Sequence, residues 1–333
     1  ATLAAFGDTN STIYYGQTSV GVITGRALNF TETIISAVSY VMIKSSDGTG
    51  WYYADGAKDT LTYTGDTHTN TTLDNLGSTA GMYSGQKVSG TNIVAGTRIT
   101  SVDSSVAVTL DTATTGTTAG VTVTKEPIAK IISANFVTTG THISTFVEMD
   151  GYLFYCTTGG SLYNSDLNSV SLYTAANFLS PNMHSDPPIA LTRHKNFILC
   201  FGTGSKEVFH NAGNATGSPL QRLPQYYDHI GTLNQRSVIT LEDQTFFVSS
   251  PHHGDIGTYH VKELQLQKIS TPQMDRILGN TSGAGGSIYA NAFRLGGYPY
   301  LGLFCSTASD GPPSNLLLES ESALLLETGD NIL

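Results

Sequence analysis

The clearest shortage in this chain of 333 residues is charge, because only 13% of the residues are Asp, Glu, Lys or Arg. That is about half of the share usual in soluble proteins. Thr, Ser, Asn and Gly take their place, which predicts a polar but weakly charged surface of the kind that neighbouring subunits cover. The formal net charge of −10 argues against nucleic-acid binding through phosphate neutralisation. An acidic wall can still line a channel through which DNA slides, because like charges repel.

Cysteine is also scarce, and no long apolar run is present. The three thiols are Cys156, Cys200 and Cys305. An odd number without a close pair argues against a disulfide framework and against a zinc site, and predicts three free thiols acting as small core residues. No apolar run reaches the ~18 residues that span a bilayer. Residues 1–12 also lack the basic start and apolar stretch of a signal peptide. We therefore expect neither a leader nor a membrane partner.

A short pattern returns four times in the second half of the chain, at a spacing of roughly 45–55 residues. Each copy consists of an apolar strand, a polar turn and a second apolar strand. The copies span residues 146–155, 189–201, 238–248 and 292–304, with turns at Asp150-Gly151, His194-Lys195-Asn196, Glu242-Asp243-Gln244 and Gly296-Gly297. A strand-only repeat of this length is typical of propeller blades, which bury their apolar faces only by stacking on neighbours.

The rest of the chain predicts an all-β, propeller-like repeat of antiparallel hairpins with an inserted small β domain. Residues 34–43 and 51–53, joined by a turn at 46–48, resemble a fifth, earlier blade fragment. Residues 61–124 are about one quarter Thr and alternate short β-branched strands with turns, as in a separate module projecting from a loop. The expected organisation is therefore an N-terminal arm at 1–26, a propeller-like core at 27–60 and 125–315, the inserted module at 61–124, and a Leu-rich tail at 316–333.

The tail and one short segment have distinctive local patterns. Three leucines followed by acidic residues occur twice, at Leu316, Leu317, Leu318 and at Leu324, Leu325, Leu326. A helix is one interpretation, but the Ser-rich turns favour β-arcs. An apolar repeat of this kind needs a partner, so these six leucines and the strands of the insertion are the candidate interface. The one convincing helix signal is at 272–278, with Thr271 as its cap and Pro272 at its first position.

Residues with possible chemistry are scattered. The densest group of potential ligands is the loop-like His252-His253-Gly254-Asp255, whose adjacent histidines would point to opposite faces of a strand. Two isolated pairs, Asp66 with His68 and Asp228 with His229, fit solvated turns. The remaining histidines lie one per segment, at His142, His184, His194, His210 and His260. None has a known ligand spacing, so we expect no metal, no cofactor and no catalytic residues.

These residues support neither a glycosidase nor a basic nucleic-acid-binding protein well. A glycosidase needs two carboxylates that face each other across a cleft, and the candidates are Glu148, Asp150, Asp166, Glu207 and Asp243. Asp150 and Asp243 occupy the same turn in different copies of the repeat, which structure explains better than catalysis. A basic nucleic-acid-binding face is poorly supported as well, since the nearest approaches to patches are Arg193 with Lys195 and Lys262 with Lys268.

Several segments of the second half occur in the order of a known family. They are 164–168, the apolar strand 196–202 that ends in Phe-Gly, the following 205–209 with its Glu and aromatic residue, 211–215, the turn before Ile230-Gly231, 267–271 and 274–278. Over residues 143–278 the chain resembles the packaged-DNA stabilisation proteins of short-tailed bacteriophages, also called tail hub or nozzle proteins. Residues 61–124 lie outside this resemblance.

The resemblance implies a non-enzymatic virion structural protein, assembled in the host cytoplasm and located in the phage tail. Six copies would form a ring below the portal and adaptor, contact other tail proteins, and enclose a lumen through which DNA passes without specific binding. Two alternatives stay open. A receptor- or glycan-binding tail protein would use the Tyr-rich loops and the inserted module, and a propeller glycosidase or lyase would use carboxylates such as Glu148 or Asp166.

Overall fold

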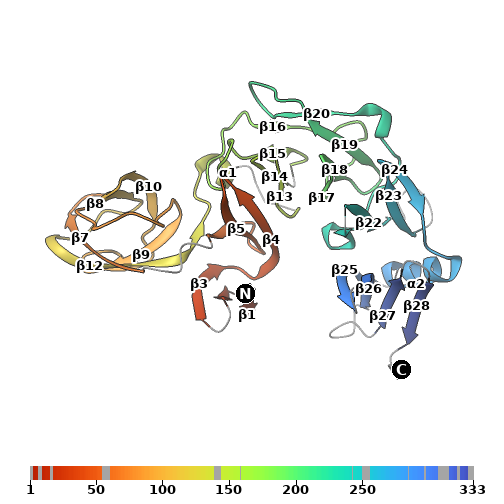
Figure 1. Cartoon of the computed structure of the whole chain (residues 1–333), viewed down its shortest axis with the longest axis horizontal. Helices are drawn as coiled ribbons and strands as arrows, with labels where there is room; N and C mark the ends of the chain where they lie inside the picture. The colour runs from red at the N-terminus through yellow and green to blue at the C-terminus, as the bar shows by residue number, and fades with distance from the viewer. Residues whose placement is uncertain are drawn as a thin grey trace. The chain divides into compact units, whose positions relative to one another are not determined.

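The computed structural model divides the chain into two compact units. It describes residues 3–6, 10–15, 18–54, 61–138, 144–157, 159–241, 243–249, 256–283, 285–295, 298–306, 315–320 and 323–328. The first unit comprises Ala1–His142, Asp150–Leu153 and Asn164–Ala175, and the second comprises Ile143–Met149, Phe154–Tyr163 and Ala176–Leu333. Strands dominate both units (Figure 1).

Four successive four-stranded sheets account for the repeat of the second half (Figure 1). In each sheet the strands pair in sequence order, and we name each blade after its first strand. The strands are β13 (Val147–Met149), β14 (Tyr152–Cys156), β15 (Leu162–Asn164) and β16 (Phe178–Leu179); β17 (Ala190–His194), β18 (Phe197–Phe201), β19 (Lys206–Asn211) and β20 (Leu220–Arg222); β21 (Val238–Leu241), β22 (Gln244–Val248), β23 (Thr258–Lys262) and β24 (Gln265–Lys268); β25 (Ser287–Leu295), β26 (Tyr298–Ser306), β27 (Asn315–Ser320) and β28 (Ala323–Thr328). Each predicted copy of the repeat supplies the first two strands of one blade, so the all-β, propeller-like fold class is confirmed.

The turn predicted at Asp150-Gly151 is confirmed, whereas the turns predicted at 194–196 and 242–244 are each one residue shorter than the sequence suggested. Asp150 and Gly151 have φ values of 54° and 81°, the left-handed conformation that a two-residue type I′ hairpin turn requires at both positions. In the next blade Lys195 has a φ of 55°, whereas His194 closes β17 and belongs to the strand. Gln244 likewise begins β22. The predicted turn residues Glu242, Gly296 and Gly297 lie outside the described residues.

The first unit begins with a three-stranded sheet, where the sequence suggested only an arm or edge strand. Its strands are β1 (Leu3–Phe6), β2 (Asn10–Tyr15) and β3 (Thr18–Thr24). Ile13 and Ile23 of this sheet pack with Trp51, Tyr53 and Ile128 of the following sheet in one apolar cluster. The Gly- and Thr-rich composition concealed these strands, because Thr, Ser, Asn and Gly separate their short apolar stretches.

The earlier blade fragment exists, but its strands differ from the predicted ones. β4 (Ala27–Ile35), β5 (Val38–Ser45) and β6 (Gly50–Ala54) pair in order, and β6 then pairs with the end of β12 (Thr117–Lys130). The single strand expected over 34–43 was wrong. A two-residue turn at Ser36 and Ala37, with φ values of 51° and 64°, interrupts it. Neither residue type signals a left-handed turn.

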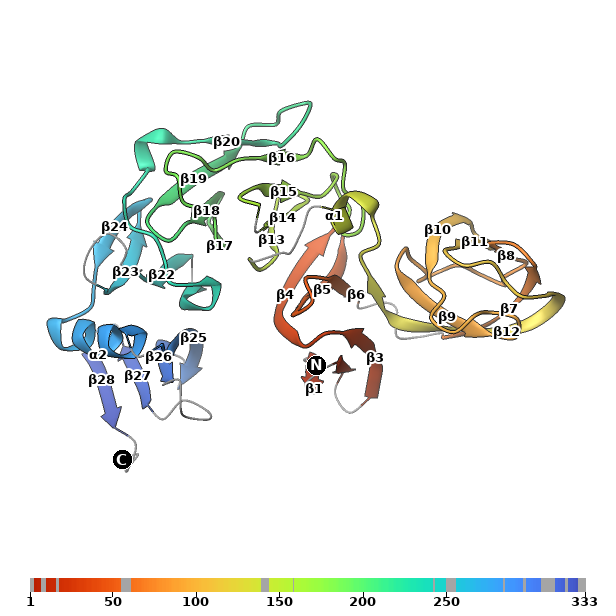
Figure 2. The ribbon, with the colours of Figure 1, turned by 180° about the vertical axis from the view of Figure 1, so that it is seen from behind.

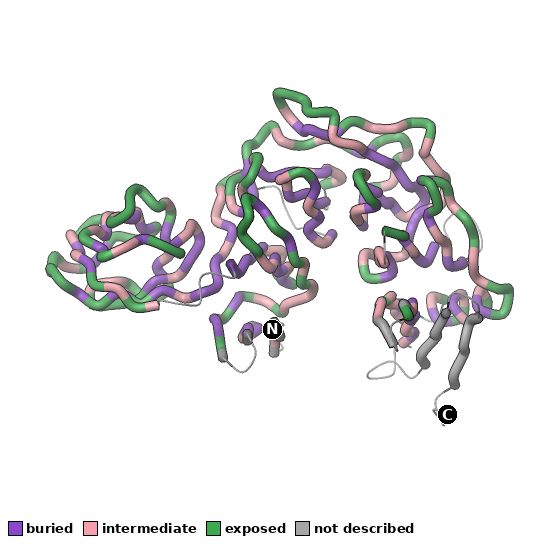
Figure 3. Tube along the Cα trace, in the orientation of Figure 1, coloured by how far each residue is buried: buried purple, intermediate pink, exposed green. Residues whose placement is uncertain are grey.

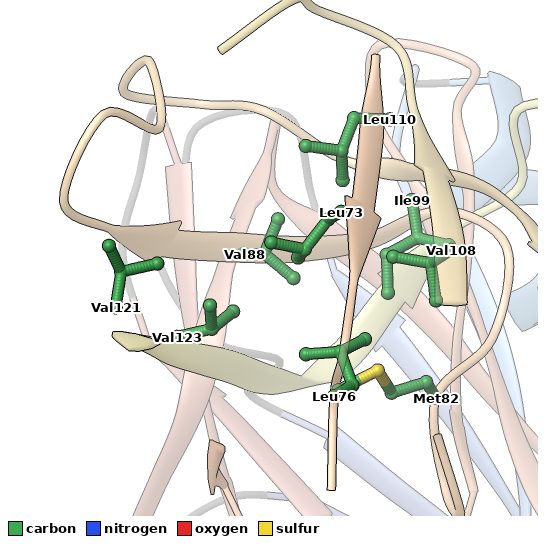
Figure 4. Packing of buried hydrophobic residues seen from close by; sticks show 9 residues of the cluster. All are labelled: Leu73, Leu76, Met82, Val88, Ile99, Val108, Leu110, Val121 and Val123. Atoms are coloured by element: carbon green, nitrogen blue, oxygen red, sulfur yellow. The ribbon is translucent and has the colours of Figure 1, made fainter. Parts of the chain in front are cut away.

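The Thr-rich segment has a core of its own. Its strands are β7 (Thr62–His68), β8 (Thr72–Asp74), β9 (Gln86–Gly90), β10 (Ile99–Ser104) and β11 (Ala107–Leu110), together with the first part of β12. Figure 4 shows the side chains that converge between these strands: Leu73, Leu76, Met82, Val88, Ile99, Val108, Leu110, Val121 and Val123. Since β12 runs without interruption from this module into the preceding blade, the two share a strand.

The boundary of the module at residue 124 is therefore crossed by backbone pairing. β9 pairs with β12 from Val123 to Ala129, which lies opposite Gln86. Gly85, just before β9, has a φ of 88°, and a Cβ built on it would lie 1.4 Å from the carbonyl oxygen of Lys130. Only a glycine lets the two backbones approach so closely.

The described residues form two short α-helices, and the predicted one is confirmed. α2 (Pro272–Gly283) starts at Pro272, and Thr271 Oγ1 accepts a hydrogen bond from the Met274 amide at 3.5 Å. Figures 1 and 2 show α2 beside the β25 blade from both sides. Its buried Met274 and Leu278 join Ile288 of that blade in an apolar cluster. α1 spans Ala134–Thr138. In the described ranges no helix is long and apolar enough to cross a membrane.

Burial follows the strands of the blades, whereas the connecting loops are more exposed (Figure 3). Four of the five residues of β18 are buried, as are the first four of β19. Strands buried on both faces read as near-continuous apolar runs. This explains why β18, Phe-Ile-Leu-Cys-Phe, lacks the alternation of a half-exposed strand.

We expect Gly85→Ala to lower the free energy of unfolding by more than about 2 kcal/mol, because it combines left-handed backbone with a collision against backbone atoms. Gly96→Ala is the matched control. Gly96 lies in the same module with a φ of 95°, but a Cβ there meets nothing within 4 Å, so only the conformational cost of about 1 kcal/mol applies. Urea unfolding of both variants measures the difference, and equal losses would contradict a crowded junction at Gly85.

Candidate functional site: ties between blades and candidate interfaces

The six leucines predicted as an interface lie in one hairpin. β27 pairs with β26, and β28 pairs with β27 as the last strand of its sheet. Leu317 lies opposite Leu326, and Leu318 lies opposite Leu325. The two leucine runs are therefore directly paired strands, neither a helix nor unpaired arcs. Among the described residues β28 is the terminal strand of its sheet, so one of its backbone edges has no neighbouring strand there.

The inserted module also has apolar side chains on its surface. Val94, Val102 and Val106 are exposed, and they lie before β10, within it and just after it. A second exposed apolar group lies on β4 and β5, where Ile34 is 68% exposed. Both β4 and β10 are terminal strands of the nine-stranded sheet. Exposed apolar side chains on strand edges are a common feature of protein interaction surfaces.

The most highly organised polar group lies in the family-like segment that starts at Ser205. Ser205, Lys206 and Glu207 are consecutive, and all three are buried. Buried polar side chains require partners, and each of these residues has one. The sequence resemblance pointed to this segment but gave no indication of what its polar residues contact.

Asp186 anchors the loop that precedes β19. Its carboxylate accepts hydrogen bonds from the Gly204 amide at 2.6 Å and from Ser205 Oγ at 2.8 Å, and it lies 2.9 Å from His184 Nδ1. Burial favours the neutral acid, but these hydrogen bonds outweigh it and hold the pKa of Asp186 below its usual value. A Cβ on Gly202 would lie 2.1 Å from Asp186 Oδ2, which explains the glycine of the Phe-Gly pair.

Lys206 ties the β17 blade to the β21 blade. Its side chain is completely buried, and Nζ lies 2.6 Å from Asp228 Oδ2 and donates to the Leu264 carbonyl oxygen at 2.6 Å. Leu264 is in the turn between β23 and β24. Burial lowers the pKa of Lys206, and the contact with Asp228 partly offsets this effect. The sequence predicted a solvated turn at Asp228 and His229, but the Asp228 carboxylate pairs with the buried Lys206.

Other polar contacts repeat this arrangement at neighbouring blades. Arg193 of β17 lies 2.8 Å from Glu148 of β13. Thr192 Oγ1 of β17 lies 2.8 Å from Thr240 Oγ1 of β21. The side chain of Gln235 bonds both to the Leu191 amide at 2.8 Å and to the Leu191 carbonyl oxygen at 3.0 Å. The first two contacts join residues of different blades. The Gln235 contact joins the β17 blade to the segment that leads into β21.

His194 belongs to the same polar layer. It is buried, and its Nδ1 lies 3.1 Å from Thr245 Oγ1 on β22. Burial lowers the pKa of His194, and the positive charges of Lys195, His260 and Lys206 add to this effect. Burial also lowers the pKa of His260, whose ring stacks on Phe246 at 4.8 Å. The fold therefore lowers the pKa of both imidazoles, that of the buried His194 and that of the half-buried His260.

The candidate glycosidase carboxylates have structural partners. Glu148 pairs with Arg193, and Glu207 lies 2.6 Å from Arg222 and accepts from the Met183 amide. Asp166 accepts from the Thr174 amide at 3.1 Å. Asp150 and Asp243 occupy hairpin turns, with φ values of 54° and 63°.

Most of the other candidate residues from the sequence analysis also have structural partners. His68 pairs with Asp74 at 2.7 Å, whereas Asp66 bonds to Asn75 and to the Gly120 amide. Of the basic pairs, Arg193 is bound to Glu148 and Lys268 to Asp275. The His252–Asp255 group and His142 lie outside the described residues. Among the residues that are described, no group of three His, Cys, Asp or Glu side chains is placed to hold a metal ion.

A family model described as "Bacteriophage P22 Gp10, beta-propeller" matches residues 79–288, more than half of the chain. The match is wider than the sequence resemblance and includes most of the inserted module. No curated protein matches the sequence.

Solved structures of other proteins share a distant likeness. Human WBSCR16 is 8% identical with a TM-score of 0.40, over 89% of this chain, which spans only 62% of that structure. BBS1N in complex with ARL6DN is 10% identical with a TM-score of 0.37, over 97% of this chain and 75% of that one. A chain of the Mitotic Checkpoint Complex is 8% identical with a TM-score of 0.41, over 97% and 84%.

We expect Lys206→Met to lower the free energy of unfolding by about 2–4 kcal/mol, because it leaves the Leu264 carbonyl and Asp228 without their buried donor. Lys268→Met is the matched control. Its ion pair with Asp275 is about as short, at 2.7 Å, but is partly exposed, so the expected loss is below about 1 kcal/mol. Denaturant unfolding at neutral pH compares the two, and a loss for Lys206→Met no larger than the control would contradict a structural tie.

The free energy of unfolding should fall as the pH drops below about 6.5, the ordinary pKa of histidine. The unfolded chain then binds protons that His194 and His260 bind less readily in the fold, where their pKa values are lowered, so protonation favours unfolding. His194→Gln removes one such group. The loss of stability between about pH 7.5 and about pH 5.5 should therefore be smaller in the variant than in the wild type. Urea unfolding at both pH values measures it, and identical losses would exclude a contribution from His194.

Proposed function

We propose that this chain is a tail hub or nozzle subunit, because it belongs to the phage stabilisation family, whose model is described as "Bacteriophage P22 Gp10, beta-propeller". The chain is a bacteriophage structural protein of the virion. In the proposed role, six copies form a ring below the portal and adaptor that retains packaged DNA and provides the channel for its ejection. The observation that carries the proposal is the family match over the stacked blades.

The physical properties of the chain support a mechanical role without catalysis. Polar contacts such as Lys206–Leu264 and Arg193–Glu148 join successive blades, so a subunit of this kind resists deformation. The net charge of −10 and the low share of charged residues suit a channel wall from which DNA phosphates are repelled. The candidate carboxylates Glu148 and Glu207 are engaged in ion pairs, which disfavours a glycosidase.

The subunit contacts in this proposal use the exposed apolar positions of the module and the leucine hairpin. The module contributes Val94, Val102 and Val106, which a polar, weakly charged surface surrounds. The hairpin contributes β28, whose outer edge has no partner within its own sheet. Burial of such positions in an assembly stabilises it at about 25 cal/mol per Å² of apolar surface.

We expect the purified protein to form a six-fold ring, either alone or on portal complexes prepared from virions. Native mass spectrometry or light scattering measures the subunit number in both preparations. A trimer would instead indicate a receptor-binding tail protein, and glycan binding and hydrolysis would be assayed next. A monomer that does not bind to portal complexes would contradict the hub proposal.

The interface within this ring can be tested by charge insertion. Leu324→Glu combined with Leu326→Glu places two charges on the terminal strand β28 and should prevent assembly. Leu167→Glu combined with Leu172→Glu is the control, since these exposed leucines lie in the loop between β15 and β16 and outside the proposed contacts. Thermal unfolding of the separated subunits distinguishes lost assembly from lost folding.

A further inference from the structure

Two of the three cysteines meet between neighbouring blades. Cys156 of β14 and Cys200 of β18 are both free and buried, and their sulfur atoms lie 4.0 Å apart. The third, Cys305, is also buried but belongs to β26 in a different blade. Because 44 residues separate Cys156 and Cys200, their contact was not predicted from the sequence.

A one-residue offset between two copies of the repeat explains the meeting. Cys156 is the fifth residue of β14, whereas Cys200 is the fourth residue of β18. Successive side chains of a strand point to opposite faces of its sheet. Cysteines at the same position would therefore point in the same direction in both blades. The offset turns them toward each other across the space between the two stacked sheets.

The surroundings keep both side chains in place as thiols. The Cys156 amide donates to Ser144 Oγ at 2.7 Å, and Cys200 is paired on both sides, with Leu191 of β17 and Glu207 of β19. Burial raises the pKa of the Cys200 thiol, and the neighbouring Cys156 adds to this effect. Protonated thiols react slowly, so the pair is stable as two thiols in a reducing cytoplasm.

We propose that Cys156 and Cys200 form an oxidation site, at which an inter-blade disulfide closes once the protein leaves the reducing cell for an oxidising medium. Intracellular thiols are kept reduced, whereas disulfides persist outside, and a virion passes from one environment to the other. Closure brings the sulfur atoms from 4.0 Å to about 2.05 Å, a shift of about 1 Å for each side chain. The disulfide would lock the β13 blade to the β17 blade.

The reaction needs an external oxidant, for which the azo compound diamide serves in vitro. One sulfur adds to an azo nitrogen, and the second sulfur then attacks the first to form the S–S bond. The azo compound leaves as the hydrazine with the two protons and two electrons that the thiols lose. Because both thiols are buried, the reaction should be slow in the native protein and should not require the ring assembly.

The test uses the native wild-type protein treated with diamide, then denatured and alkylated with iodoacetamide. The reduced protein should take up label at all three cysteines, and the oxidised protein at Cys305 alone. Trypsin should place the three cysteines on separate peptides, since Arg193 and Lys195 lie between the first two and Arg294 precedes the third. Mass spectrometry should then find the first two joined. The midpoint of thermal unfolding should rise by about 5 °C and return on reduction.

Variants assign the bond to this pair. Cys305→Ser should still lose two thiols on oxidation, whereas Cys156→Ser should lose none. Three free thiols after prolonged treatment of the native wild type, or a crosslink that includes Cys305, would overturn the proposal. The peptide map of the wild type decides the question even if Cys156→Ser fails to fold. The result is independent of subunit number, so it can fail or succeed separately from the tail hub proposal.

Discussion

Face-to-face stacking of four-stranded sheets is the interaction on which this structure depends. A blade such as β17–β20 is apolar on both faces, so it is stable only when neighbours cover it. The rings of Phe201 and Phe247, from successive blades, lie 4.7 Å apart within a shared apolar cluster. The next cluster continues through Val248 and α2 to Ile288 of the β25 blade. The β21 blade therefore contributes to both clusters, through Phe247 on one side and Val248 on the other.

Apolar stacking is non-directional, so it does not fix the position of one blade on the next. The buried polar contacts fix that position, because each needs a particular partner atom. Lys206 reaches a single carbonyl oxygen in the next blade, at Leu264, and a single carboxylate, Asp228. A buried ion pair contributes little net stability, but a misplaced partner is costly. These contacts therefore disfavour sliding of one blade over another. The same requirement accounts for the consecutive polar residues of the family-like segment, which would otherwise be expensive to bury.

The candidate site was predictable only in part. The sequence resemblance identified the segment around Lys206. The repeated leucine pattern at the end of the chain identified the residues that form β27 and β28. The partners of these residues were not predictable, since Asp228 and Leu264 are distant in sequence from Lys206. Asp228, which the sequence analysis assigned to a solvated turn, instead pairs with the buried Lys206, because side chains find partners across sheets. The meeting of Cys156 with Cys200 was missed for the same reason.

The sequence by itself determined the all-β class, the blade repeat, the helix at Pro272 and a separate Thr-rich module. Strand periodicity and turn chemistry are local properties, and residues close in sequence express them. Only the tertiary structure decided the turn at Ser36 and Ala37, whose residue types do not favour positive φ, and the strands hidden in the first 26 residues. It also decided which faces meet. Contacts between blades join residues some 45 positions apart, and packing alone selects them.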